Sequence, residues 1–120
     1  MIYTHSDGTR LIQLIYGKQK FKKKDRIVFS MDGSHFPIPM EGVTEQFAQN
    51  GVLLLVEKIR KKKNFAVLSV ARLRALAEEG RAKKRSNIYI RSFNGSGEIK
   101  IPLPAAARWV ESIAAHEMRR

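Results

Sequence analysis

The chain has 120 residues, enough for one domain with its own hydrophobic core, so we expect a single domain over residues 1–120. It contains no cysteine, which excludes disulfides, thiolate catalysis and cysteine-ligated metal sites. Lys and Arg number 23 against 11 Asp and Glu, and the net charge of +12 favours a polyanionic partner, which would relieve self-repulsion. Nucleic acid is the first candidate, an acidic protein or an anionic membrane surface is the second, and a basic surface that serves solubility alone is the remaining alternative. No apolar run approaches the roughly 20 residues of a membrane span and no signal peptide is visible, so we expect a cytoplasmic protein.

Residues 1–41 are predicted to form an N-terminal β-meander. The segments RLIQLIY at residues 10–16 and RIVFSM at residues 26–31 are rich in strand-forming residues. Asp7-Gly8 and Asp32-Gly33 are typical of tight turns, because glycine accepts positive φ. The following HFPIPM segment contains two prolines, which predict an edge strand or an irregular extended segment because proline cannot donate a ladder hydrogen bond.

Residues 42–120 are predicted to mix helices and strands. The segment VTEQFAQN can form a short helix with Thr44 as its N-cap. Residues 52–59, VLLLVEKI, fit either a buried strand or the second half of a long helix from Thr44, and the branched aliphatic cluster favours the strand. The segment NFAVLSV at residues 64–70 predicts another strand.

Two further helices are predicted to flank a hairpin in the C-terminal part. Ser69 is suited to cap a helix that Gly80 closes. The segments IYIRSF and EIKIPL alternate apolar and polar residues and are joined by NGSG, which predicts a β-hairpin. Pro104 then opens an amphipathic helix, whose apolar stripe consists of Ala106, Trp109, Val110, Ile113 and Ala114.

The predicted fold class is α+β. We expect a small antiparallel sheet of six to eight short strands with two or three helices, and the C-terminal amphipathic helix packed on the sheet. The alternative is a winged-helix-like C-terminal part. In that case the helix after Ser69 would present Arg72, Arg74 and Arg81 to a nucleic-acid groove, and the hairpin would be the wing.

Basic residues gather in three clusters, each beside a predicted connection between elements. The first cluster consists of Lys18, Lys20, Lys22, Lys23, Lys24 and Arg26, with Phe21 inside it. The second cluster consists of Lys58, Arg60, Lys61, Lys62 and Lys63. The third cluster consists of Arg81, Lys83, Lys84 and Arg85, with Arg72 and Arg74 earlier on the same predicted helix.

The position of these clusters on the sheet decides what they can bind. In an antiparallel meander alternate turns lie at the same end, which would separate the Asp-Gly turns from the first cluster. If the second and third clusters join the first, their cations can meet successive phosphates of a nucleic acid. The alternative is that each cluster is an ordinary solvated turn.

Aromatic residues lie close to some of these cations. Tyr89, Arg91 and Phe93 alternate with Ile88 and Ile90, so they share one face of a predicted strand. Aromatic side chains beside cations can stack on unpaired bases. The alternative places Tyr89 and Phe93 in the core, with the two isoleucines outward or packed against another layer.

The catalytic candidates are His5, Asp7 and His35. A His–Asp pair in a basic pocket can cleave RNA by acid–base chemistry without a metal. Ordinary surface or turn positions also explain all three residues. These two histidines and His116 lack the i, i+4 spacing of a helical metal pair, so we expect no metal and no cofactor.

Together these patterns favour a non-enzymatic nucleic-acid-binding protein that contacts the phosphate backbone through its basic loops and Arg91. Two alternatives stay open: a small basic ribonuclease of the toxin type, and an adaptor or inhibitor that binds an acidic protein. Association of two copies through the apolar stripe of residues 104–118 is a further hypothesis.

Overall fold

The computed structural model describes residues 2–17, 22–23, 26–31, 34–39, 52–92 and 97–118. Side chains are described for residues 2–16, 53–92 and 97–115. The predicted helix after Thr44, the Asp32-Gly33 turn and most of the NGSG turn lie outside the described residues.

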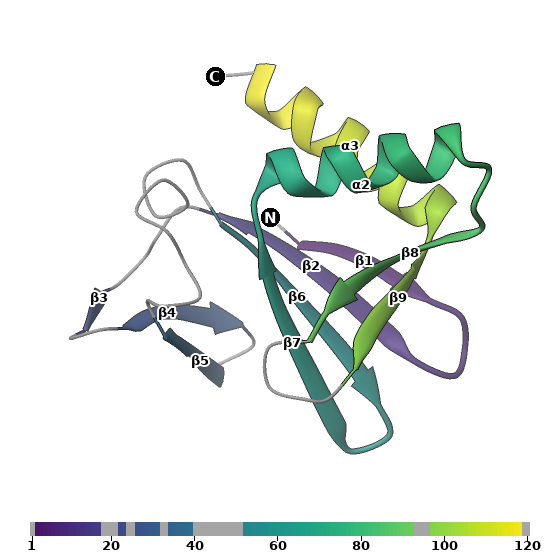
Figure 1. Ribbon diagram of the computed structural model, residues 1–120. Helices are drawn as coiled ribbons and strands as arrows, with labels where there is room; N and C mark the ends of the chain where they lie inside the picture. Colours follow the sequence, from purple (N-terminus) through teal and green to yellow (C-terminus); the bar gives the residue numbers. More distant parts are fainter. Residues whose placement is uncertain are drawn as a thin grey trace.

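Four antiparallel strands form the main sheet (Figure 1). They are β1 (Ile2–Ser6), β2 (Leu11–Gly17), β6 (Val52–Ile59) and β7 (Lys62–Leu68), in the spatial order β1-β2-β6-β7. The segment that sequence alone left open between strand and helix is therefore a strand, β6, and it lies between β2 and β7. Residues 53–56 of β6 are all fully buried. Both faces of this strand are covered, which explains why its apolar run is continuous and does not alternate.

Three further strands pair with one another in a second antiparallel sheet. They are β3 (Lys22–Lys23), β4 (Arg26–Met31) and β5 (Ser34–Pro39), in the order β3-β4-β5. Among the described strands β5 pairs with β4 alone, so its two prolines lie in an edge strand, as predicted.

The expected N-terminal meander is divided between the two sheets. Strand β2 pairs with β6 and not with β4. This pairing sets Leu14 opposite Leu55 and Tyr16 opposite Leu53, and all four side chains belong to the core. Cross-strand apolar pairs of this kind stabilise a sheet, and nothing local to residues 1–41 predicts them.

A hairpin and two helices complete the main core (Figure 1). Helix α2 (Val70–Ala82) is followed by strands β8 (Asn87–Arg91) and β9 (Glu98–Pro102), and then by helix α3 (Leu103–Met118). One cluster of buried side chains joins the main sheet, the hairpin and both helices. It includes Leu14, Leu55, Ile99, Ile101, Leu73 and Trp109.

The predicted α+β class and the packing of the C-terminal helix are therefore confirmed. The expectation of one small sheet is wrong: six strands share the main core in a four-stranded and a two-stranded sheet, and β3, β4 and β5 form a third sheet.

Helix α2 begins where the sequence predicts but ends later. Ser69 Oγ accepts a hydrogen bond of 3.1 Å from the backbone N–H of Arg72, which caps the helix. Gly80, expected to close α2, lies inside it and is buried. A Cβ at this position would lie 3.0 Å from Leu103 Cδ1 and 3.3 Å from Ile88 Cγ2. The glycine therefore allows close contact of α2 with α3 and β8.

The C-terminal elements serve the core. The hairpin follows a helix, as in the winged-helix-like alternative, but Ile88, Ile90, Ile99 and Ile101 are buried. One face of the hairpin therefore packs on the core, and the winged-helix-like alternative stays a prediction. In α3 the predicted stripe buries Ala106, Trp109 and Ile113. Because this stripe completes the core, association of copies through residues 104–118 stays a prediction that would need other side chains.

Candidate nucleic-acid interface

The second basic cluster surrounds the turn between β6 and β7. Ile59 pairs with Lys62, which leaves Arg60 and Lys61 as a two-residue turn. Residues 60–63 are exposed and Lys58 is half-buried. Lys58 lies directly opposite Lys63 in the ladder, and like charges in this relation destabilise a sheet.

The third basic cluster lies at the C-terminal end of α2, where Arg81, Lys83, Lys84 and Arg85 are all exposed. Arg72 is exposed and Arg74 is half-buried on the same helix. Lys83 Nζ donates a hydrogen bond of 2.9 Å to Glu79 Oε1.

The pKa of Glu79 indicates how these cations are grouped. The hydrogen bond from Lys83 lowers this pKa most, and the charges of Lys83, Arg85 and Arg72 lower it further. The nearby cations Lys83, Arg85 and Arg72 therefore stabilise the charged form of this carboxylate.

Both basic turns contain a strained cation. Among the described residues two that are not glycine have a left-handed backbone: Arg60 with φ 57° and Lys84 with φ 53°. A side chain in this region costs roughly 1–2 kcal/mol, which glycine avoids. At Lys84 the strain has a structural cause. Lys84 N–H donates to Arg81 O at 3.2 Å and Arg85 N–H donates to Gly80 O at 2.8 Å, the bonds of a Schellman motif.

The second and third clusters lie apart. Leu11 pairs with Lys58, so the start of β2 lies beside the end of β6. The β6–β7 turn therefore shares one end of the sheet with the Asp7-Gly8 turn. The third cluster lies at the far end of α2, at the upper right of Figure 1, whereas the β6–β7 turn is at the bottom. The condition that the second cluster lies at the end of the sheet opposite the Asp7-Gly8 turn is therefore not met.

The first cluster lies mostly outside the described residues. Backbone is described for β3 and for the start of β4, where Lys23 pairs with Arg26. The cluster follows β2, which ends at Gly17 opposite Val52, away from the β6–β7 turn. No side-chain position is described for its members Lys18, Lys20, Phe21, Lys22, Lys23, Lys24 and Arg26.

The outer face of the β8–β9 hairpin combines an aromatic ring with charges. Tyr89 is 49% exposed, so the alternative that placed it in the core is wrong. Tyr89 pairs with Lys100, and Arg91 pairs with Glu98. All four side chains are exposed. Phe93, the second aromatic residue predicted for this face, lies outside the described residues.

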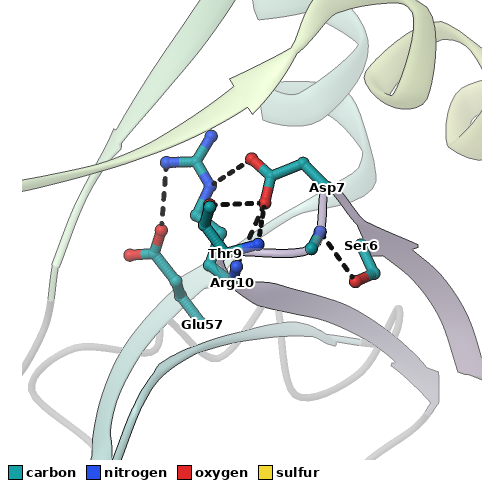
Figure 2. A network of polar contacts seen from close by, with 6 residues as sticks. Ser6, Asp7, Thr9, Arg10 and Glu57 are labelled. Carbon is teal, nitrogen blue, oxygen red and sulfur yellow. Dashed lines mark hydrogen bonds and ion pairs between the residues drawn. The ribbon is translucent and has the colours of Figure 1, made fainter.

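The catalytic candidates have separate environments. Asp7 Oδ1 accepts hydrogen bonds from Thr9 N–H at 2.9 Å, Thr9 Oγ1 at 2.7 Å and Arg10 N–H at 3.0 Å (Figure 2). This carboxylate is thus engaged by its own turn. His5 is half-buried in β1, and its Nε2 is buried without a hydrogen-bond partner among the described residues. His35 belongs to β5, where side chains are not described. Within the described part of the chain, no group of three acidic or histidine side chains could hold a metal ion.

A buried polar group that the sequence did not predict lies beside this turn (Figure 2). Glu57 is 3% exposed, and its Oε1 lies 3.4 Å from Arg10 Nη1. Asn64 Nδ2 donates to Glu57 Oε2 at 3.5 Å. Arg10 Nε also lies 3.5 Å from Asp7 Oδ2, an ion pair without hydrogen-bond geometry. The available signal was the strand period of two, which places Glu57 on the same face as Leu53 and Leu55.

Comparison with known proteins gives no match: no family model, no curated protein and no solved structure is significantly similar to the chain. Among the described helices, none has the length and apolar character required to cross a bilayer. The basis for assigning a function is therefore the chemistry of the residues themselves.

Proposed function

We propose that the protein is a non-enzymatic nucleic-acid-binding protein, in which the second and third clusters contact the phosphate backbone. The observation that carries this proposal is the pair Arg60 and Lys84. Each is a cation in a left-handed turn position where glycine would be less strained. At both positions the backbone is less stable than it would be with glycine, but the side chain places a positive charge in solvent. Such a charge can contact the phosphates of a polyanion.

The net charge of +12 and the exposure of both clusters support the proposal. Phosphate contacts by lysine and arginine release condensed counterions, so such contacts give affinity without base specificity. Because the two clusters lie apart, they would meet separate segments of a bound strand or duplex.

Charge reversal in the second cluster tests the proposal. Lys61→Glu should weaken binding of an oligonucleotide severalfold and make the slope of log K against log salt shallower by about one, because one phosphate contact is lost. Arg108→Glu is the matched control. It changes the net charge equally, at an exposed position on α3 outside the clusters. Equal weakening by both variants would contradict the role of the second cluster, and absence of wild-type binding at low salt would contradict the function.

The same samples separate binding from ribonuclease activity. A binding protein returns its RNA intact after prolonged incubation. Cleavage that the His5→Ala variant abolishes would instead favour the small ribonuclease, because His5 is the candidate histidine whose side chain the structure describes.

A further inference from the structure

The outer face of the β8–β9 hairpin is held rigidly by its inner face. Ile88, Ile90, Ile99 and Ile101 alternate with the outward residues and are all buried in the core. Strand β8 also starts directly after the third cluster, because only Ser86 separates Arg85 from Asn87. The outer face of the hairpin is therefore fixed on the core and lies next to the third cluster in the chain.

Tyr89 is unusual on this surface. Among the residues whose side chains are described, Tyr89 is the one exposed aromatic residue. Trp109 and Tyr16 are buried, and Tyr3 and Phe65 are half-buried. A tyrosine ring is large and mostly apolar, and it is usually buried or used in contacts. Here nearly half of the residue's surface faces solvent.

The charged neighbours of Tyr89 on this face are two cations and one carboxylate, and Asn87 and Pro102 lie on its other side. Lys100 lies directly opposite Tyr89 in the ladder, and Arg91 lies two residues further along the same face. Opposed side chains start about 5 Å apart, and residues i and i+2 of one strand about 7 Å apart, so both cations can reach groups bound over the ring. Glu98, opposite Arg91, repels phosphate. A phosphate is therefore bound more favourably beside Lys100 than beside Glu98.

We propose that this face stacks one unpaired base on Tyr89, with Lys100 and Arg91 on the adjacent phosphates. The ligand class is single-stranded nucleic acid, because bases in a duplex are already stacked and paired and cannot cover the ring. This inference rests on the proposed nucleic-acid-binding function and extends it from backbone contact to a base contact.

Substitution of the ring tests the base contact. The probes are a fluorescent pyrimidine 12-mer in ribo and deoxyribo forms, the same strand with abasic sites, and the matching duplex. Tyr89→Ala should lower the affinity for both single strands by roughly 5- to 150-fold, the loss expected when one base stack is removed. Binding of the duplex and of the abasic strand should stay within about twofold of wild type, because phosphate contacts do not need the ring.

Two further variants separate stacking from folding. Tyr89→Phe keeps the ring and should bind like wild type, whereas Tyr89→Thr keeps a strand-forming residue without a ring and should behave like Tyr89→Ala. Wild-type affinity of Tyr89→Ala for the single strands, or an equal loss for strand and duplex, would overturn the base contact and leave the backbone proposal standing. Failure of the wild-type protein to bind any probe would overturn both proposals.

Discussion

At the level of single residues, Asp7 holds the β1–β2 turn together through one carboxylate oxygen. The pKa of Asp7 is lowered from its ordinary value of 3.8 to about 2, first by the Thr9 hydroxyl and then by the backbone N–H groups of Thr9 and Arg10. The folded pKa lies below the unfolded one. The charged carboxylate therefore stabilises the fold above about pH 4, and this contribution is lost as the pH falls toward 2.

Asp7→Asn should remove this dependence on acid. The amide keeps an acceptor oxygen but does not take up a proton in this range. The free energy of unfolding of the wild type, minus that of the variant, should therefore decrease between pH 4 and pH 2. Urea unfolding followed by circular dichroism at a series of pH values measures this difference. A difference that stays constant across the series would show that Asp7 is not the group responsible.

The Arg10–Glu57 pair predicts an unequal response to removal of its two partners. Arg10→Ala should cost about 2–4 kcal/mol of unfolding free energy, because Glu57 would remain buried as a charge beside one distant amide. Glu57→Gln should cost about 1 kcal/mol, because Arg10 keeps Asp7 as a partner and the amide oxygen still accepts. Urea unfolding measures both values, with Arg108→Ala as an exposed control expected within about 0.5 kcal/mol of wild type. A larger loss for Glu57→Gln would contradict this assignment.

At the level of elements, Lys84 at the end of α2 has two roles. It occupies the left-handed position of the Schellman motif, and it belongs to the third cluster that we propose contacts phosphates. Lys84→Gly should raise the free energy of unfolding by about 1 kcal/mol, because glycine adopts the left-handed position of the Schellman motif without strain. Lys84→Ala removes the same charge but keeps the Cβ, so it should give no such gain. Thermal unfolding compares the two variants.

Nucleic-acid binding by the same two variants adds a second comparison. Both lose the charge, so both should bind an oligonucleotide more weakly and to a similar degree. If Lys84→Ala is as stabilising as Lys84→Gly, relief of repulsion among the cations explains the gain, and the strain at Lys84 does not.

At the level of the whole molecule, local patterns predicted elements well and contacts between elements poorly. The start of α2 and the strand β7 follow from capping and strand-forming residues that lie next to one another in the chain, whereas the apolar run of β6 left strand and helix open. Gly80 was expected to close α2 but lies inside it. The reason for a glycine at this position is its close contact with Leu103, which belongs to another helix and could not be found from the local pattern. The burial of Glu57 follows from strand periodicity, but its partner Arg10 is brought close by the pairing of β2 with β6.

For the candidate interface too, the local sequence predicted which residues take part but not how they are arranged in space. The sequence identified the cations of the second and third clusters, and the exposure of most of these cations is usual for lysine and arginine. Their position relative to one another depends on the order of strands in the sheet and on the path of α2, which no local pattern specifies. The exposed ring of Tyr89 depends in the same way on which face of the hairpin meets the core.

The salt dependence of wild-type binding tests the central claim most directly. The affinity for a single-stranded 12-mer would be measured by fluorescence anisotropy at several concentrations of monovalent salt. If the exposed clusters contact phosphates, log K should fall linearly with log salt, with a slope of about −0.7 for each phosphate contacted in a single strand. An affinity that does not change with salt, or no binding at the lowest salt concentration, would contradict the claim that this is a nucleic-acid-binding protein.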